Sequence, residues 1–397
     1  MGAPQTRLSE LGEKLIDLGW EVEALTALPN YPTGKIFPGY SKWRTKVETV
    51  GRIRTARVPL FAAKRGFLRR LLSYLSFAAS AAWNGPKLLA KPDVLLVESP
   101  PLFIGYAARS LARKWKCPYV FNVSDLYPET AVRVGVMRRG AAIKMAERLE
   151  QKLYHNAAGI TGQSDEIINE VRKHAPEKPT AVITNGVEFS RFGKDRADDD
   201  ARELLGQEPG PVFIYAGLMG LAQGLDQVLD LAASLPEDVP GRFVLIGEGP
   251  LREKLEKRVS GNPNPRVRIL PQIPHDRIPA VLGAADAAVI SLGMTIPGAV
   301  PSKIYEAMAS SLPILLIADG EPARRVVDAS AGLAVQPGQP QEALDAYRRL
   351  AVDAELRSRL GAAGRRAAQQ QYDRRIIAGH LDKFLRSCFE DGVGKQS

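Results

Sequence analysis

Short runs of apolar and β-branched residues alternate with longer segments of helical periodicity along most of the chain. Short apolar runs predict buried strands, and apolar positions three and four residues apart predict amphipathic helices. Strands are expected at residues 21–28, 93–98, 119–123, 159–162, 181–184, 212–216, 242–246, 266–270, 287–291, 314–318 and 332–335. Helices are expected between them, among others at 103–116, 141–155, 225–235, 303–310 and 340–353. Such alternation is typical of α/β proteins with parallel sheets covered on both faces.

The alternation is interrupted near the middle of the chain. After the strand at 181–184 comes the turn signal Asn185-Gly186-Val187, followed by a polar stretch over 191–210 that ends in Glu208-Pro209-Gly210. We interpret this stretch as a linker, which predicts two doubly wound, Rossmann-like domains, 1–188 and 189–375, facing each other across a cleft. Ligands of open parallel sheets bind beyond the carboxyl ends of the strands, so the site is expected in that cleft.

Composition narrows the class of protein. The 397 residues are enough for two domains, and 45% of them are hydrophobic, which excludes a disordered chain. The longest uncharged apolar stretch, residues 71–83, falls short of the roughly 20 residues that span a bilayer. No secretory signal is recognised at the start. Cys117 and Cys388 are far apart in sequence, which argues against a disulfide framework and fits a reducing cytosol.

The net charge of +10 is concentrated in the first half of the chain. Residues 1–180 hold 28 basic and 16 acidic side chains, whereas residues 181–397 hold 26 and 28. Ten of the basic residues lie within 42–70, where Glu48 is the single acidic residue, and aromatic residues lie among them and in a helical stretch ending at Asn84-Gly85-Pro86. This mixture predicts docking on anionic lipid. A solvated face is the alternative. Nucleic acid is not expected as a partner, because the aromatics lack a regular stacking pattern.

A glycine-rich loop, Gly217-Leu218-Met219-Gly220-Leu221-Ala222-Gln223-Gly224, follows the strand at 212–216 and precedes a helix. Glycines allow backbone N–H groups to approach an anion, and a helix N-terminus adds partial positive charge, so the loop predicts a phosphate or diphosphate site. A tight turn without a ligand is the alternative. The loop is not G-x-G-x-x-G, so it does not indicate nicotinamide dinucleotide binding.

A second motif, Pro301-Ser302-Lys303-Ile304-Tyr305-Glu306, predicts a helix start with Ser302 as N-cap and Pro301 just outside it. A lysine in the first turn opposes the helix dipole, which favours a ligand role for Lys303 at a phosphate. Glu306 lies on the same helical face and could accept hydrogen bonds from the hydroxyls of a ribose. A capping box or a plain Lys–Glu surface pair is the alternative.

Polar residues also follow the strands of the first half. Asp125 and Glu129 come directly after the strand at 119–123 and could accept a proton or bind sugar hydroxyls, although Asp125 could instead cap the following turn. The segment from Asn30 to Lys35 occupies the equivalent place after the strand at 21–28. Asp198-Asp199-Asp200 fits a D-x-D metal–nucleotide signature but is interpreted as solvated linker. Hydrolase, kinase and metalloenzyme motifs are missing from the sequence.

Seven motifs are spread over nearly the whole chain: GAPQTRLSELGEKL, LPNYPTGKIFPGY, NVSDLYPETAVRVGV, ITNGVEFSRF, YAGLMGLAQGLD, LIGEGPLREKL and VPSKIYEAMAS. Together they resemble the family 4 retaining glycosyltransferases with the GT-B fold, in the bacterial branch that builds O-antigen, capsule or colanic-acid-type polysaccharides. The resemblance implies sugar transfer, with retention and without a metal or other cofactor, from a nucleotide diphosphate donor that is usually UDP-linked. It also implies a C-terminal helix, 376–397, that returns to the N-terminal domain.

Residue roles follow from the same resemblance. Lys303 and the 217–224 loop are expected to hold the diphosphate, Glu306 the ribose, and backbone near Ile273 the base. The expected donor residues are Gly2, Gly217, Gly220, Gln223, Gly224, Ile273, Pro301, Ser302, Lys303 and Glu306, and the expected catalytic residues are Asp125, Lys303 and Glu306. The expected acceptor or membrane residues are Tyr31, Lys35, Trp43, Arg44, Arg65, Arg69, Arg70 and Glu129. The acceptor is expected to be a polyprenyl-diphosphate-linked glycan, and the protein is expected in the cytoplasm, bound peripherally to the inner face of the cytoplasmic membrane.

The chain departs from the family pattern at several positions. Gly298 replaces the first glutamate of an E-x7-E pair, Leu218 and Gln223 replace basic residues of the glycine loop, and Ser124 replaces a histidine. Because the sequence starts inside a glycine loop at Met1-Gly2, the first strand of the N-terminal domain is expected to be missing, which we interpret as a misplaced start. A GT-B epimerase of nucleotide sugars and a basic binding protein for membrane or nucleic acid are the alternatives to a transferase.

Overall fold

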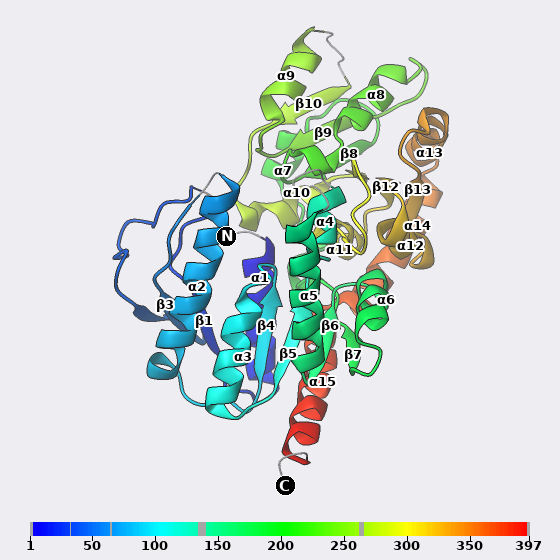
Figure 1. The fold of residues 1–397 in the computed structure, drawn as a ribbon. Coiled ribbons are helices and arrows are strands. Elements are labelled where there is room, and N and C mark those ends of the chain that lie inside the picture. The colour runs from blue at the N-terminus through cyan, green and yellow to red at the C-terminus, as the bar shows by residue number, and fades with distance from the viewer. Residues whose placement is uncertain (1–2, 32, 64–65, 134–139, 262–265, 395–397) are drawn as a thin grey trace. The chain divides into compact units, whose positions relative to one another are not determined.

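The computed structural model describes residues 3–31, 33–63, 66–133, 140–261 and 266–394. The chain divides into two compact units (Figure 1). Unit 1 comprises Met1–Thr184 and Ile377–Ser397, and unit 2 comprises Asn185–Ile376. Each unit contains a parallel sheet with helices packed against it, so the predicted α/β class is confirmed.

Unit 2 is built on a six-stranded parallel sheet in the order β10-β9-β8-β11-β12-β13. The strands are β8 (Val212–Ala216), β9 (Arg242–Ile246), β10 (Val267–Leu270), β11 (Ala287–Ser291), β12 (Ile314–Ile317) and β13 (Gly332–Val335). From β8 the chain adds strands toward one edge, and from β11 it adds them toward the other. The strand order therefore reverses between β8 and β11, which is the point where open parallel sheets bind ligands.

Helices cover both faces of this sheet. They are α7 (Asp199–Leu205), α8 (Asp226–Ser234), α9 (Arg252–Gly261), α10 (Ile278–Ala284), α11 (Ser302–Ala309), α12 (Gly320–Asp328), α13 (Pro340–Val352) and α14 (Ala354–Ala367), with short turns Phe189–Arg191, Lys194–Arg196, Leu221–Gln223 and His275–Arg277 and a π-helical turn at Ala368–Tyr372. Successive strand residues point to opposite faces. Ile214 accordingly packs in one core and Tyr215 in the other, and both are buried.

Unit 1 contains two sheets among its described residues. One has the order β1-β3-β2, from β1 (Glu23–Ala27), β2 (Lys46–Val50) and β3 (Ile53–Val58); the other has the order β4-β5-β6-β7, from β4 (Leu95–Ser99), β5 (Tyr119–Val123), β6 (Gly159–Gly162) and β7 (Thr180–Val182), and is parallel throughout. The helices are α1 (Ala3–Asp17), α2 (Phe67–Leu88), α3 (Ile104–Trp115), α4 (Glu129–Arg133), α5 (Ala141–Asn156), α6 (Asp165–His174) and the later part of α15 (Arg374–Gly394). One face of β5 packs on α3, α5 and α6, and the other on α1 and α15.

Two local expectations were wrong. The stretch 191–210 is not a featureless linker: Asp198 caps α7 by accepting a hydrogen bond from the Ala201 backbone N–H (2.9 Å), and its carboxylate pairs with Arg277. Buried Ala201 and Leu205 hold α7 on the unit 2 core. The helix expected to end at 84–86 continues to Leu88 with Pro86 inside it. In addition, segment 46–58, for which no strand was predicted, forms β2 and β3, and among its cations Arg54 pairs with Glu23 and Arg57 with Glu48.

Candidate active site

The glycine-rich loop lies at the carboxyl end of β8, beside the point where the strand order of unit 2 reverses. Gly217 adopts φ 146° and Gly224 φ 58°, conformations that side-chain-bearing residues rarely adopt. The backbone N–H groups of Gly217 and Met219 donate to Ile246 and Glu248 carbonyls, each at 2.8 Å, and that of Gly220 donates to Gln223 Oε1 at 3.1 Å. These three N–H groups are therefore engaged within the protein and shape the loop.

Two neighbouring loops hold this loop in place. A Cβ on Gly247, which follows β9, would lie 1.8 Å from the Gly217 carbonyl oxygen, and one on Gly249 would lie 2.3 Å from the Met219 carbonyl oxygen. On the other side, the Gly293 N–H donates to the Ala222 carbonyl at 2.9 Å. The loops after β9, β8 and β11 thus meet at one edge. Gly247, Gly249 and Gly293 were missed as site residues, although the LIGEGPL motif after a predicted strand was the available signal.

Lys303 projects from the first turn of α11 onto the glycine-rich loop. A Cβ on Gly217 would lie 2.3 Å from Lys303 Cε and 2.7 Å from its Nζ, and Nζ lies 5.3 Å from the centroid of the Tyr215 ring. Burial of the ammonium group lowers the pKa of Lys303, and the charge of Glu306 partly opposes this shift. A desolvated cation at the carboxyl edge of the sheet can stabilise a bound phosphate strongly, because little water screens it.

Glu306 lies one turn after Lys303 on the same face of α11 and is half-buried. Ser302 is not the N-cap: α11 starts at Ser302, Pro301 is the cap residue, and no side chain caps the helix. The first helical N–H groups are thus left without a side-chain acceptor, which suits an anion at this end. Gly298 adopts φ 71°, a left-handed conformation that explains glycine where the family pattern has glutamate.

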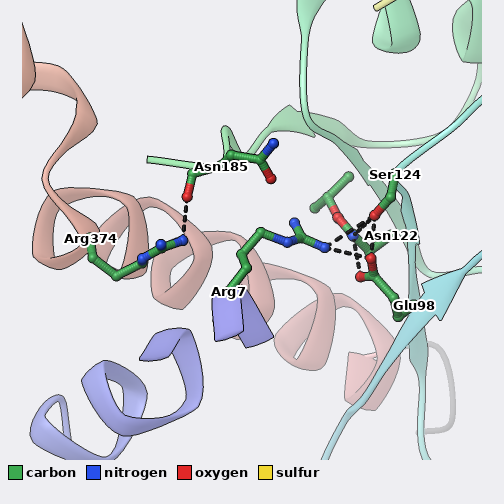
Figure 2. A network of polar contacts seen from close by, with 7 residues as sticks. Arg7, Glu98, Asn122, Ser124, Asn185 and Arg374 are labelled. Atoms are coloured by element: carbon green, nitrogen blue, oxygen red, sulfur yellow. Dashed lines mark hydrogen bonds and ion pairs between the residues drawn. The ribbon is translucent and has the colours of Figure 1, made fainter. Parts of the chain in front are cut away.

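Asn185 positions the segment that leads into α11, and sequence reasoning identified it only as a turn residue. Its side-chain amide donates to the Val300 carbonyl at 3.3 Å, and its own carbonyl accepts a hydrogen bond from Arg374 (Figure 2).

Ile273 follows β10 and packs partly on the unit 2 core, two strands away from β8. The side-chain oxygen of Gln223, Oε1, accepts a hydrogen bond from the Gly220 N–H of the same loop. Its side-chain nitrogen, Nε2, is therefore the group that could contact a ligand.

In unit 1, a buried polar network lies at the carboxyl ends of β4 and β5 (Figure 2). Arg7 of α1, only 5% exposed, forms an ion pair with Glu98 and donates to Ser124 Oγ at 3.1 Å. Asn122 Nδ2 donates to Glu98 Oε2 at 2.6 Å, and Ser124 donates to the same carboxylate. Glu98 therefore accepts from three side chains, which orients it firmly. Arg7 and Glu98 were not identified from the sequence, because no short motif contains both.

Asp125 and Glu129 lie just beyond this network, at the start of α4. Asp125 accepts a hydrogen bond from Thr130 Oγ1 at 2.6 Å, and burial raises the pKa of its carboxyl group. Glu129 is half-buried and is one of the acidic neighbours of Glu150, whose pKa is raised to about 7, mainly by burial. A change in the protonation of Asp125 would therefore also affect the hydrogen bond that it accepts from Thr130.

The expected membrane residues fall on two segments of unit 1. Tyr31, Lys35, Trp43 and Arg44 are exposed in the connection between β1 and β2, and Arg69 and Arg70 are exposed on α2. Gly2 and Arg65 lie outside the described residues. Four further cations within 42–70 pair with carboxylates, which partly neutralises their charge: Arg52 with Asp17, Arg54 with Glu23, and Lys46 and Arg57 with Glu48.

Helix α2 presents a continuous apolar stripe to solvent. Leu68, Leu72, Leu75, Ala79 and Trp83 are spaced three and four residues apart and are all exposed, with Leu68 at 69% and Trp83 at 71%. The opposite face of α2 is buried through Ala78 and Ala81. None of the helices in the described part of the chain has the length and apolarity needed to cross a bilayer. Within the same residues, no cluster of three or more His, Cys, Asp or Glu side chains could hold a metal ion.

Comparison with known proteins assigns both units to one class of enzyme. Residues 197–367 match the family model "Glycosyl transferases group 1", and residues 2–186 match "Glycosyl transferase 4-like domain". The chain is 29% identical over 314 residues to the putative colanic acid biosynthesis glycosyl transferase WcaI of Escherichia coli, covering 76% of each chain. The protein is therefore a glycosyltransferase.

Solved structures show that the fold is shared. Sucrose-phosphate synthase of Thermosynechococcus elongatus superposes with a TM-score of 0.78 at 20% identity, covering 98% of this chain and 94% of that one. HepE of Anabaena in complex with UDP-glucose gives a TM-score of 0.64 at 17% identity, covering 85% and 86%. Together with the two family models, these likenesses show that the chain belongs to the family 4 type of glycosyltransferases with the GT-B fold.

Proposed function

We propose that this glycosyltransferase transfers a sugar, with retention and without a bound metal, from a UDP-sugar to a polyprenyl-diphosphate-linked glycan during synthesis of a cell-surface polysaccharide. The observation that carries the donor part is the desolvated Lys303 ammonium packed on Gly217 beside the switch point of the unit 2 sheet. The leaving group of the reaction is a nucleoside diphosphate, so a fixed cation there stabilises the charge that develops in the transition state. The names of WcaI and of HepE with UDP-glucose support the pathway and the donor.

Glu306 is assigned to the ribose of the donor. A carboxylate one turn after Lys303 would accept hydrogen bonds from the vicinal ribose hydroxyls while the lysine holds the diphosphate. On this assignment, Glu306 contributes equally to uridine and UDP binding, whereas Lys303 contributes to UDP alone.

We expect Glu306→Ala to weaken the binding of both uridine and UDP by about tenfold or more, the loss associated with a charge-assisted hydrogen bond. Isothermal titration with the two ligands measures this directly. Glu253→Ala, which removes an exposed carboxylate from α9 of the same unit, is the control and should bind like the wild type. Unchanged UDP affinity in Glu306→Ala would reject the ribose assignment.

The acceptor part of the proposal rests on the apolar stripe of α2 and the cations beside it. Five exposed apolar positions on one helical face are costly to keep in water, and insertion into the interface of a bilayer would bury them. Arg69 and Arg70 begin the same helix, and Lys42 and Arg44 are exposed in the β1–β2 connection, so anionic headgroups complement this surface. A membrane-bound acceptor would then be delivered to unit 1, on the inner face of the cytoplasmic membrane.

We expect the double variant Leu72→Glu/Trp83→Glu to lower partitioning onto vesicles with 30 mol% phosphatidylglycerol by about 100-fold, because two apolar side chains lose their burial. Flotation at low salt measures bound protein. Val352→Glu changes an exposed apolar residue of unit 2, 62% exposed, and should bind like the wild type. Equal flotation of the double variant and the wild type, or no flotation of the wild type, would refute the docking surface without touching the donor assignment.

A further inference from the structure

A cavity of about 600 Å³ lies in unit 1 at the edge of the sheet where β5, β6 and β7 begin. Its wall includes Pro118 before β5, Ala158 before β6 and Pro179 before β7. The Arg7–Glu98 network lies at the opposite, carboxyl ends of these parallel strands. The cavity is therefore separate from the part of unit 1 that the transferase reaction is expected to use.

Part of the cavity lining, here called the floor, is made of small apolar and thiol side chains. It contains Ala112, Ala157 and both cysteines of the chain, Cys117 and Cys388, which are free thiols and nearly inaccessible, at 8% and 1% exposure. Two uncharged polar side chains also line the cavity: the hydroxyl of Tyr119 donates to the Leu153 carbonyl at 2.8 Å, and Nδ2 of Asn156 donates to the Lys152 carbonyl at 2.6 Å. The alanine and cysteine side chains of the lining suit a hydrocarbon group.

The rim of the cavity is cationic. Arg109, Arg113, Lys116 and Lys178 line it, with Glu177 as the single acidic lining residue. Glu177 pairs with His155 at 3.8 Å, and Lys178 donates to the Ala157 carbonyl at 3.0 Å. In the described part of the chain, no carboxylate lies within ion-pair distance of Arg109, Arg113 or Lys116. The lining side chains thus carry a net positive charge.

The helix dipole explains only part of this arrangement. Arg113 stands in the last turn of α3 and Lys116 just after it, where cations are ordinarily favourable. Arg109 lies well before that turn, and its Nε is buried without a hydrogen-bond partner. A buried donor left unpaired is costly, so an acceptor that belongs to no described residue would account for it.

We propose that this cavity binds an organic phosphate, with its phosphate on the guanidinium groups of Arg109 and Arg113 and its apolar part against Cys117 and Cys388. Guanidinium groups bind phosphate oxygens through paired hydrogen bonds, and Lys116 adds charge at the rim. The ligand needs both features, because the rim alone would hold a simple anion and the floor alone would hold a neutral hydrocarbon. This site does not depend on the proposed transferase reaction.

The two cysteines provide a local readout, because they are the only thiols of the chain and both line the cavity. Alkylation of Cys117 and Cys388 by iodoacetamide would be followed by mass spectrometry of their peptides, at alkaline pH because burial raises the pKa of Cys117 to about 11. Octyl phosphate at ten times its dissociation constant is expected to slow both alkylations about tenfold, by occupancy. Inorganic phosphate should protect less, and equal protection by the two would overturn the organic part of the proposal.

Variants of the rim test the phosphate contact. Arg109→Gln/Arg113→Gln should lose the protection by octyl phosphate, and Arg109→Lys should keep part of it because the charge remains. Arg359→Gln, which removes one positive charge at an exposed position of unit 2, should keep all of it. Partial protection in Arg109→Lys would show that the cavity still forms when Arg109 is replaced. Loss of protection in the double variant would then reflect lost phosphate binding rather than a lost fold. Undiminished protection in the double variant, or none in the wild type at millimolar octyl phosphate, would overturn the site.

Discussion

We expect Lys303→Ala to lower kcat/KM for a UDP-sugar by about 100- to 1,000-fold, the loss seen when a preorganised charge-stabilising group is removed from an active site. The ammonium group is already desolvated against Gly217 and Tyr215, so the protein has met part of the cost of burying it before the donor arrives. On the proposed assignment, its interaction with the leaving diphosphate would be strong and would strengthen as charge develops. The rate of UDP release with a membrane extract as acceptor measures the effect.

Binding measurements sharpen this test. Lys303→Ala should weaken UDP binding far more than uridine binding, because only UDP carries the diphosphate. Lys254→Ala is the matched control, since Lys254 is an exposed lysine of unit 2 paired with Asp226. Equal losses for uridine and UDP would place Lys303 away from the diphosphate. Conversion of the UDP-sugar into an isomeric UDP-sugar, without an acceptor and without net release of UDP, would favour an epimerase.

We expect Gly247→Ala to abolish most activity and to destabilise unit 2 by about 1–3 kcal/mol, the range for overpacking a rigid site. The added Cβ would lie 1.8 Å from the Gly217 carbonyl oxygen, a backbone atom that cannot rotate away. The loops after β8 and β9 must separate to admit it, which breaks the Gly217 N–H to Ile246 carbonyl hydrogen bond and moves Gly217 away from Lys303. Thermal unfolding and UDP titration measure the two effects.

The matched control is Gly261→Ala at the end of α9, where an added Cβ meets nothing within 4 Å. This variant should retain activity and stability, because it changes the same residue type without a clash. If Gly247→Ala bound UDP with wild-type affinity, the close contact between the loops after β8 and β9 would not be needed for UDP binding.

The apolar pattern of the sequence was sufficient to predict much of the strand arrangement along unit 2. The strands at 212–216, 242–246 and 287–291 were predicted with the bounds they have, because they are continuous apolar runs buried on both faces. Segment 46–58 was missed as strand because charged residues interrupt its apolar positions. Those charges pair across the sheet and with α1, as Arg57 does with Glu48 and Arg52 with Asp17, and such pairs are invisible before the strands are paired.

The candidate site also combines residues that local sequence signals identified with contacts that only the folded structure shows. Lys303 and Gly217 were each identified by a local signal, a cation in a first helical turn and a glycine-rich turn after a strand. Their contact joins residues 86 positions apart and exists only because β8 and β11 are neighbours in the sheet. Arg7 and Glu98 carried no local signal, since a salt bridge spanning 91 positions depends on how α1 packs against β4.

The sequence by itself determined the α/β class, the run of strands in unit 2 and the family, because apolar periodicity and short motifs are local properties of the chain. The tertiary structure decided which of the basic residues remain open to a partner and which are paired. It also decided that Lys303 is desolvated, because burial depends on neighbours contributed by β8 and the loop after it. The uneven distribution of charge is a property of the sequence. Which cations remain without a carboxylate partner, at the α2 surface and at the Arg109 cavity, was decided only when folding paired the others.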